Sequence, residues 1–216
     1  MANNIQNIFN ESLQDTNLSD KQKTVLKASL DLFSTKGFDS TSTKDIANSA
    51  GVAEGTVYQQ FKNKRGILDA ILNPFIDSVL PKIVLDFTDA VKGNQFDNVH
   101  DFLTYVIKNR MKFALTNQNQ VRIFAQEIFK SNKLLNQMKK QLGNLLDGPV
   151  AQQLQKFQER GEIAPIPIPR LIQFLFSTTV SFVLPAILNQ QGNVTNEQID
   201  GWTEQSVDFI LHGITL

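Results

Sequence analysis

The chain has 216 residues, and its 21 Lys and Arg balance 21 Asp and Glu, so the formal net charge is zero. It has no cysteine and two histidines, which excludes a disulfide-stapled scaffold, a thiolate metal site and a histidine-rich zinc site. Hydrophobic residues make up 41% of the chain, enough for a packed core. We therefore expect a folded protein without a metal or another cofactor. The neutral balance argues at first sight against nucleic acid, but it hides how charge is distributed along the chain.

The two segments that could direct the chain to a membrane do not have the required character. Residues 1–18 lack a basic start and an apolar run, so they do not form a signal peptide, and their Asn and Gln content predicts a flexible N-terminal arm. The apolar core of the longest charge-free stretch, 174–188, has only 15 residues and contains Pro185 and several hydroxyl side chains. A buried helix fits it better than a membrane span. We expect a cytoplasmic protein that does not contact a membrane.

Helix signals punctuate the first third of the chain. Capping-box spacings at Ser19 and Ser42 predict the starts of two helices, and Gly37 and Gly51 predict their ends. Further short helices are predicted at 54–61 and from residue 63 onward.

Beyond residue 73 the predicted helices lengthen and carry most of the phenylalanines. Pro74 and Pro81 should kink the helix that spans 64–92. No segment alternates polar and apolar residues between hairpin turns, so no sheet is predicted. The sequence predicts an all-α fold of about nine helices. Its expected parts are a flexible N-terminal arm, a three-helix helix-turn-helix domain and a helical ligand-binding and dimerisation domain, at 1–18, 19–66 and 67–216 respectively.

Residues 43–61 have the spacing of a helix-turn-helix motif. Ala47 gives the first helix a small contact face, Gly51 permits the turn, and two valines fill the angle between the helices. The second helix would present short hydrogen-bonding side chains to a DNA major groove. Three cations that could meet phosphates follow it, Lys62, Lys64 and Arg65. An ordinary antiparallel helical hairpin shows the same pattern, so the spacing alone leaves DNA binding open.

A longer pattern resembles the TetR (tetracycline repressor-like) family of transcriptional regulators. Its parts are LFSTKGF at 32–38, TSTKDIANSAGV at 41–52 and GTVYQQFKNKRGIL at 55–68. The resemblance does not reach 73–216. It implies a bacterial-type homodimeric regulator, most simply a repressor, that binds palindromic double-stranded operator DNA. A hydrophobic small-molecule effector would release it from that DNA.

The resemblance also implies individual DNA contacts. Thr41 and Ser42 match positions that contact phosphate, and Ser42 is also a helix cap. Positions that approach bases are occupied by Glu54, Gly55, Tyr58 and Gln59, and further phosphate positions by Thr56, Gln60 and Lys64. Two of these depart from the family pattern. Gln60 replaces an aromatic residue or histidine, and Glu54 replaces a cation or glutamine, so Glu54 must either accept from a cytosine amino group or turn away.

Local charge favours DNA only mildly. Residues 19–72 hold eight basic and six acidic residues. We expect the protein to depend on two-fold symmetric, shape-matched contacts, to bind non-specific DNA weakly, and to lose affinity as salt rises.

The phenylalanines of the second half can either line a pocket or form plain core. The resemblance favours a pocket that some of them line. No acidic cluster marks this half as a receptor for cations, so we expect a neutral, acyl or aromatic effector. The candidate lining residues are Phe102, Tyr105, Asn109, Phe113, Phe124, Gln126, Ile128, Phe174 and Ser177.

The last two helices, predicted near 170–190 and 197–212, could form a four-helix bundle with their symmetry mates. The candidate dimer residues are Phe176, Val180, Phe182, Val183, Trp202, Phe209 and Ile210. An intrachain core without a partner is the alternative.

These features suggest release by population shift. The effector would bind better when the two DNA-binding domains are wrongly spaced for successive major grooves, and the helix over 64–92 would act as the lever. One alternative is a DNA-binding protein that answers to a protein partner or only organises DNA. An enzyme is not expected, because the sequence shows no metal-ligand cluster, no cysteine and no glycine-rich phosphate loop.

Overall fold

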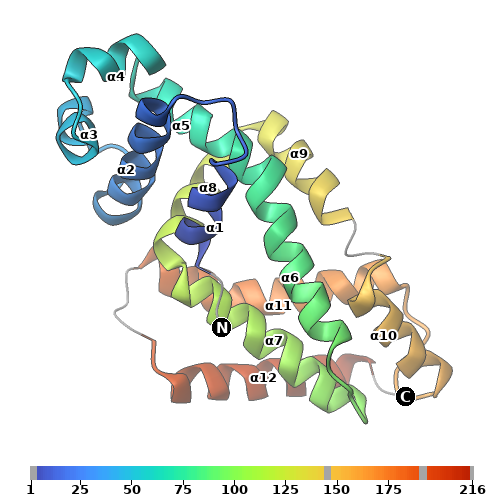
Figure 1. Ribbon diagram of the computed structural model, residues 1–216. Helices are drawn as coiled ribbons and strands as arrows, with labels where there is room; N and C mark the ends of the chain where they lie inside the picture. Colours follow the sequence, from blue (N-terminus) through green and yellow to red (C-terminus); the bar gives the residue numbers. More distant parts are fainter. Residues whose placement is uncertain (1–3, 144–146, 190–193, 215–216) are drawn as a thin grey trace. The chain divides into compact units, whose positions relative to one another are not determined.

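The computed structural model describes residues 4–143, 147–189 and 194–214. Within these ranges the chain forms twelve α-helices and one π-helical segment and contains no strand (Figure 1). The predicted all-α class is therefore confirmed, although the helices are more numerous than the nine expected. In chain order the elements are α1 (Ile5–Ser12), α2 (Asp20–Lys36), α3 (Thr43–Ala50), α4 (Glu54–Phe61), α5 (Lys64–Pro74), η1 (Phe75–Val79), α6 (Leu80–Lys92), α7 (Val99–Thr116), α8 (Gln118–Lys130), α9 (Asn132–Leu142), α10 (Pro149–Glu159), α11 (Ile168–Leu188) and α12 (Asn196–Ile214).

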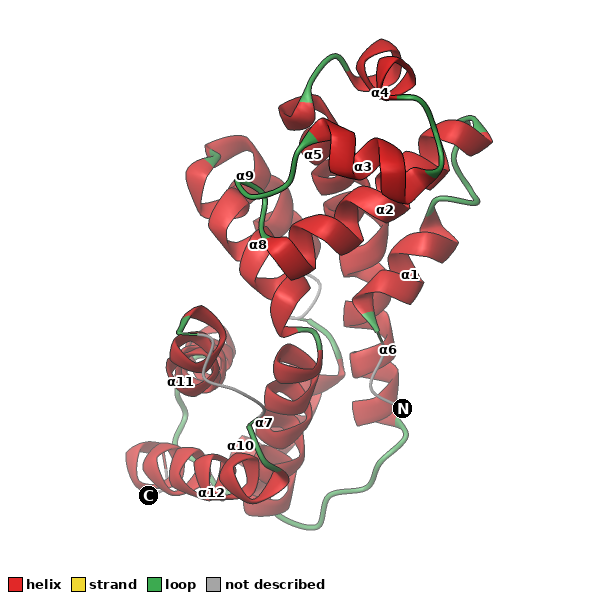
Figure 2. Cartoon of the chain, turned by 90° about the vertical axis from the view of Figure 1, so that its left-hand side faces the viewer, coloured by secondary structure: helices red, strands yellow, loops and turns green. Residues whose placement is uncertain are grey.

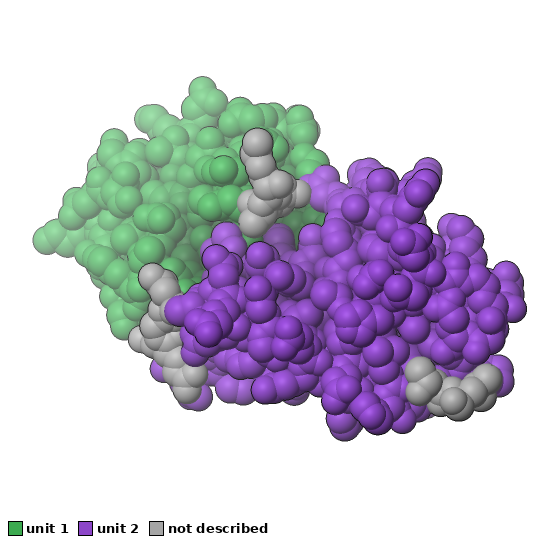
Figure 3. Space-filling model, turned by 90° about the horizontal axis from the view of Figure 1, so that it is seen from below, with its two compact units in different colours: residues 1, 3–83, 117–141 green, residues 2, 84–116, 142–216 purple. Residues whose placement is uncertain are grey.

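The chain divides into two compact units, which Figure 3 shows in different colours. Among the described residues, unit 1 contains 4–83 together with Asn117–Gln141. Unit 2 contains Val84–Thr116 and Leu142–Leu216. Helices α8 and α9 thus belong to the same unit as the N-terminal helices, although they follow them by more than forty residues in the chain.

The N-terminal helices α2, α3 and α4 begin and end where the sequence predicts. Ser19 and Ser42 each form a complete capping box, so that backbone N–H groups at both helix starts are satisfied. Gly37 has φ of 89° and Gly51 has φ of 66°, a region that favours glycine, and each ends its helix. Helix α3 packs against both α2 and α4 (Figure 2).

The expectation of a flexible arm over 1–18 is wrong for residues 5–12, which form α1. Asn4 caps this helix by accepting from two backbone N–H groups. Ile5, Ile8 and Phe9 are buried, and α1 packs on η1 and α2. The Ile5 backbone N–H also donates to Asn117 Oδ1 at 2.7 Å. The apolar residues stand at helical spacing within the polar composition, and burial of that stripe stabilises the helix.

The two prolines predicted to kink the helix over 64–92 flank a π-helical segment. Pro74 is the last residue of α5, and Pro81 lies in the first turn of α6. Between them, the Leu80 backbone N–H bonds to the Phe75 carbonyl, five residues back. Proline has no N–H to donate, so local loss of the α-helical ladder at these positions is expected.

In unit 2, α7 packs against α11 and α12, and α10 packs against α11. Helix α11 is the one described helix long and apolar enough to cross a membrane, with a mean hydropathy of 1.9 over an 18-residue window that is 33% buried. Core helices of soluble proteins meet the same criterion. Its buried stripe includes Leu175, Thr179 and Val183, whereas Phe174, Phe176 and Leu188 are exposed, so the predicted buried helix is buried along one face only.

Candidate DNA-binding and effector sites

The helix-turn-helix consists of α3, the turn at Gly51–Ala53 and α4. The Val52 N–H donates to the Ala47 carbonyl at 3.0 Å and closes the turn. Val57 is 1% exposed and fixes which face of α4 is buried. The opposite face carries Tyr58, which is 49% exposed, and exposed glutamines at 59 and 60.

A polar cluster joins the exposed side of α4 to the first residue of α3. The Thr43 hydroxyl donates to Glu54 Oε1 at 2.8 Å and lies 3.0 Å from the Tyr58 hydroxyl. The sequence leaves two alternatives for Glu54, a contact with a cytosine amino group or a side chain turned away from DNA. In the structure the carboxylate is turned toward α3, which corresponds to the second. Sequence reasoning missed Thr43, because it stands 11 and 15 positions from its partners.

The other predicted DNA residues divide into buried and exposed groups. Thr41 is 1% exposed, and its hydroxyl donates to the Gly37 carbonyl at 2.8 Å. The predicted phosphate contact by this side chain is therefore not supported, because the side chain does not reach the surface. Lys64 Nζ donates to the Phe38 carbonyl at 2.7 Å and lies 4.4 Å from the Phe38 ring centroid. Ser42 and Gly55 are exposed, and a Cβ on Gly55 would meet no atom within 4 Å. Thr56 is partly exposed.

The start of α3 also has a fixed charge. Hydrogen bonds from the Ser42 backbone N–H and hydroxyl lower the pKa of Asp45, with Lys36 adding a favourable charge at 3.9 Å. Asp45 therefore stays ionised as the capping carboxylate of the helix, where the helix dipole favours negative charge.

The connection from α4 to α5 is tightly constrained. Lys62 has φ of 63°, the only positive φ of a non-glycine residue in the described ranges. A Cβ on Gly66 would collide with the carbonyl oxygen of Phe61, so glycine is required for the close approach of α5 to the end of α4. Asn63 caps α5 by accepting from the Gly66 N–H at 2.8 Å.

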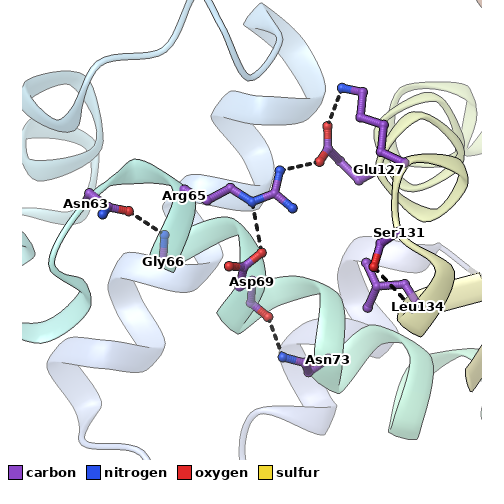
Figure 4. A network of polar contacts seen from close by, with 9 residues as sticks. Asn63, Arg65, Gly66, Asp69, Asn73, Glu127, Ser131 and Leu134 are labelled. Atoms are coloured by element: carbon purple, nitrogen blue, oxygen red, sulfur yellow. Dashed lines mark hydrogen bonds and ion pairs between the residues drawn. The ribbon is translucent and has the colours of Figure 1, made fainter.

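An ion-pair network holds the first turn of α5 to α8 (Figure 4). Arg65 donates to Glu127 Oε2 at 2.6 Å and to Asp69 at 3.1 Å. Lys130 donates to Glu127 Oε1 at 2.8 Å. Burial raises the pKa of Glu127, but the hydrogen bonds from Lys130 and Arg65 outweigh it and leave that pKa lowered. A pocket of about 310 Å³ adjoins the network, lined by Arg65, Asp69, Leu72, Asn73, Ser131, Lys133 and Leu134.

The nine candidate effector residues are divided between the two units. Unit 1 contains the three that lie on α8, Phe124, Gln126 and Ile128. The Phe124 ring stacks on the Phe75 ring with centroids 3.4 Å apart, whereas Gln126 is exposed on another face of the helix. Ile128 is buried.

The six candidates in unit 2 do not form one site either. Phe102 is 0% exposed and contacts the Phe96 and Phe157 rings, which makes it core. Phe174 is 41% exposed and Ser177 is also exposed, so they face outward from α11.

Three of these residues do lie together on α7. Tyr105 contacts the Phe96 ring at 5.3 Å, Asn109 accepts from Arg110, and Phe113 lies under the Arg110 guanidinium. Tyr105 and Asn109 also line a pocket of about 440 Å³ with His100, Asp101, Thr104, Lys108 and Lys112. Sequence reasoning missed Arg110, because an arginine in an amphipathic helix is normally read as solvated.

The candidate dimer residues have very different exposures. Phe176 and Phe209 are 63% and 74% exposed, which leaves two large apolar side chains uncovered in the single chain. Val183 and Ile210 are 5% and 4% exposed, so these two belong to the core of the chain and their assignment to the dimer surface is corrected. Both stand on the buried stripes of their helices. The remaining three are partly exposed, Val180, Phe182 and Trp202.

An N-terminal helix-turn-helix with an exposed polar recognition helix, carried by an otherwise helical chain, defines a helix-turn-helix DNA-binding protein. Residues 25–71 match the model of bacterial regulatory proteins of the tetR family, and residues 80–216 match the model of the YcdC-like protein C-terminal region. The chain belongs to the tetR family of transcriptional regulators, as its motif resemblance implied.

Known relatives agree with this assignment. An uncharacterized HTH-type transcriptional regulator of Bacillus subtilis, YvkB, is 43% identical over 51 residues, which cover 24% of this chain and 27% of the relative. The fatty acid metabolism regulator protein of the same organism is 25% identical over 176 residues, 79% of this chain and 86% of the relative. The crystal structure of the B. subtilis transcriptional regulator FadR in complex with stearoyl-CoA matches with a TM-score of 0.64 and 21% identity, over 88% of this chain and 97% of that one.

Proposed function

We propose that the chain is a cytoplasmic homodimeric repressor that a long-chain acyl-CoA releases from palindromic operator DNA. The observation that carries the effector class is the similarity to B. subtilis FadR, whose crystal structure is in complex with stearoyl-CoA, together with the similarity to the fatty acid metabolism regulator over 79% of the chain. Tyr105 on α7 in unit 2 supports it, because it lines a pocket of about 440 Å³ and contacts the Phe96 ring.

In this proposal, α4 is the recognition helix. The residues proposed to contact DNA are Ser42, Gly55, Thr56, Tyr58, Gln59 and Gln60. Each is wholly or partly exposed on α4 or at the start of α3. Thr41 and Lys64 instead hold the backbone of the loop that precedes α3, since both donate to carbonyls in 37–39. Glu54 orients Thr43 and thereby the Tyr58 hydroxyl.

The dimer is proposed to form through the uncovered faces of α11 and α12. An aromatic side chain that is 74% exposed, as Phe209 is, costs the monomer the hydrophobic free energy of its unburied surface. Two-fold pairing would bury the same patch twice and would set the spacing of the two recognition helices.

The test is operator release in solution. Fluorescence anisotropy would measure binding of the purified protein to DNA that flanks its gene, with palmitoyl-CoA, free CoA or no addition. We expect tight binding without ligand and release by palmitoyl-CoA alone. Tyr58→Ala should weaken DNA binding about tenfold or more, while its thermal unfolding and its response to palmitoyl-CoA stay unchanged. DNA binding that ignores every acyl-CoA would sink the effector proposal and favour control by a protein partner.

A further inference from the structure

We infer that Arg110 is the residue that recognises the acidic group of the effector, an inference that rests on the effector-controlled function proposed above. Arg110 lies on α7 in unit 2. Its guanidinium carbon is 4.0 Å from the Phe87 ring centroid and 5.0 Å from the Phe113 ring centroid. Both distances are within the range of a cation–π contact, so the two rings stabilise the cation without accepting a hydrogen bond from it.

The polar partner of this cation is neutral. Within the described ranges, Arg110 Nε and Nη2 donate to Asn109 Oδ1 at 3.1 and 2.5 Å. A guanidinium has five N–H donors, so these two bonds leave donors for a ligand. Burial lowers the pKa of Arg110 to about 10, which still leaves the side chain charged at neutral pH.

Two of the other arginines have carboxylate partners, since Arg65 donates to Glu127 and Asp69 and Arg160 donates to Glu162. Arg122 donates to a backbone carbonyl and Arg170 to an amide oxygen instead, and Arg170 is exposed to solvent. Arg110 differs from Arg170 because its surroundings desolvate it, although it too donates to an amide oxygen. A partly buried cation is costly without an anion, and an acidic ligand group would supply one.

The surroundings specify an amphipathic ligand. Tyr105, Asn109 and Phe113 stand at four-residue spacing on α7 and therefore share one face of the helix, and the Phe96 ring contacts Tyr105. Tyr105 and Asn109 also line the pocket of about 440 Å³, and Asn109 accepts from Arg110. Among the described residues, the lining of this pocket includes Lys108, Lys112 and Asp101 but not Arg110 itself. The ligand class is therefore an aliphatic chain that ends in an anionic group, either a carboxylate or the phosphates of an acyl-CoA.

The experiment measures ligand affinity in wild type and in Arg110→Gln by isothermal titration calorimetry. Three probes share one acyl chain: palmitate carries a carboxylate, palmitoyl-CoA carries phosphates, and palmitoyl-pantetheine carries no charge. Loss of a charged hydrogen bond should weaken binding of the recognised anion about 10- to 100-fold. The affinity for palmitoyl-pantetheine should change by less than about threefold. The palmitate and palmitoyl-CoA arms identify which acidic group Arg110 receives.

Lys92→Gln is the matched control, because it removes one exposed cation from the end of α6 and should leave all affinities unchanged. Equal affinities of wild type and Arg110→Gln for both anionic probes would overturn the role of Arg110 but would leave the proposed effector class standing. A loss that is the same for palmitoyl-pantetheine would also overturn this role, since it would mean that Arg110 only packs the aromatic residues. If wild type binds none of the three probes, the proposed effector class fails as well.

Discussion

Arg65 and Glu127, 62 positions apart in the chain, are joined by a hydrogen bond of 2.6 Å between α5 and α8. Arg65 lies four residues after the end of α4, the proposed recognition helix, so this ion pair ties the start of α5 to α8. Glu127 is 5% exposed, whereas the Arg65 side chain is 50% exposed. Loss of a cationic partner should therefore cost the buried Glu127 carboxylate more free energy than loss of the carboxylate costs the exposed Arg65 or Lys130 side chain, which water can solvate.

Replacement of this carboxylate should weaken both folding and control. Glu127→Gln removes a charged acceptor from a buried position, and we expect it to lower the free energy of unfolding by about 1–3 kcal/mol. It should also reduce the release of operator DNA by effector. Urea unfolding and fluorescence anisotropy measure the two effects. Lys130→Gln, whose side chain is 67% exposed, is the control and should cost less than about 1 kcal/mol. If Glu127→Gln and Lys130→Gln lower the free energy of unfolding equally, the Arg65–Glu127 ion pair does not stabilise the fold beyond the Lys130–Glu127 pair.

The same pair predicts a pH dependence. The folded-state pKa of Glu127 is lowered from its ordinary value of 4.5, so the carboxylate stabilises the fold fully above that value. This contribution is lost as the pH falls through the lowered folded-state pKa. The stability difference between wild type and Glu127→Gln should therefore be constant between about pH 7 and pH 5 and shrink below about pH 4. Urea midpoints at several pH values measure it, and a difference that grows on acidification would reverse the assigned sign.

Two glycines near the recognition helix should respond oppositely to alanine. Gly66→Ala places a Cβ against the Phe61 carbonyl oxygen, so we expect a loss of about 1–3 kcal/mol in the free energy of unfolding. Gly55→Ala meets open space inside a helix, and alanine should stabilise the fold by about 0.5–1 kcal/mol. Because Gly55 lies on the proposed DNA-facing side, Gly55→Ala should still weaken operator binding. Calorimetric unfolding and DNA titrations separate the effects, and destabilisation by both substitutions would argue against this packing.

The Thr43 hydroxyl is predicted to organise the DNA-facing side of α4. Thr43→Val keeps the shape of the side chain but removes the group that contacts Glu54 and Tyr58. We expect operator affinity to fall about three- to tenfold, with little change in thermal stability, because the site is at the surface. Thr43→Ser retains the hydroxyl and should bind like wild type. If valine and serine behave alike in DNA titrations, the hydroxyl has no positioning role.

The exposed face of α12 gives a prediction about assembly. Phe209→Ser should raise the dimer dissociation constant at least about tenfold, because each dimer buries two copies of this ring. Sedimentation equilibrium measures the change. Leu85→Ser is a matched control, since Leu85 is also a large exposed apolar residue, at 57%, but lies on α6. A larger effect of Leu85→Ser than of Phe209→Ser would place the dimer surface elsewhere.

Local sequence signals predicted most of the N-terminal fold. Capping boxes at Ser19 and Ser42 and the helix ends at Gly37 and Gly51 depend on residues within four positions of each other, and the structure confirms all four. The polar composition of residues 1–18 predicts no helix, and only the helical spacing of the apolar residues within them indicates α1. Periodicity also placed Val183 and Ile210 on apolar helices, but it could not tell a stripe facing the chain's own core from one facing a partner.

The long-range parts of the site could not be predicted from spacing. Glu127 is paired with Arg65, and Thr43 with Tyr58, only because of how their helices pack. Arg110 stands where an amphipathic pattern would place a solvated side chain, and only the positions of Phe87 and Phe113 reveal the stacked cation. A carboxylate or cation gains its role from neighbours that no local motif specifies.

The π-helical turn at Phe75–Val79 has a consequence for changes in chain length. A π turn accommodates one residue more than the equivalent α turn, and Pro74 and Pro81 mark its two sides. Removal of Ser78 would leave a regular α-helix, because the residue lost is the one that the π turn accommodates, and α6 would keep its rotational phase relative to α5. Buried Ile83 and Phe87 would then stay on the faces that they bury. A single-residue deletion in this segment should therefore be tolerated, whereas the same deletion within α6 would turn all later residues of that helix by about 100° about its axis.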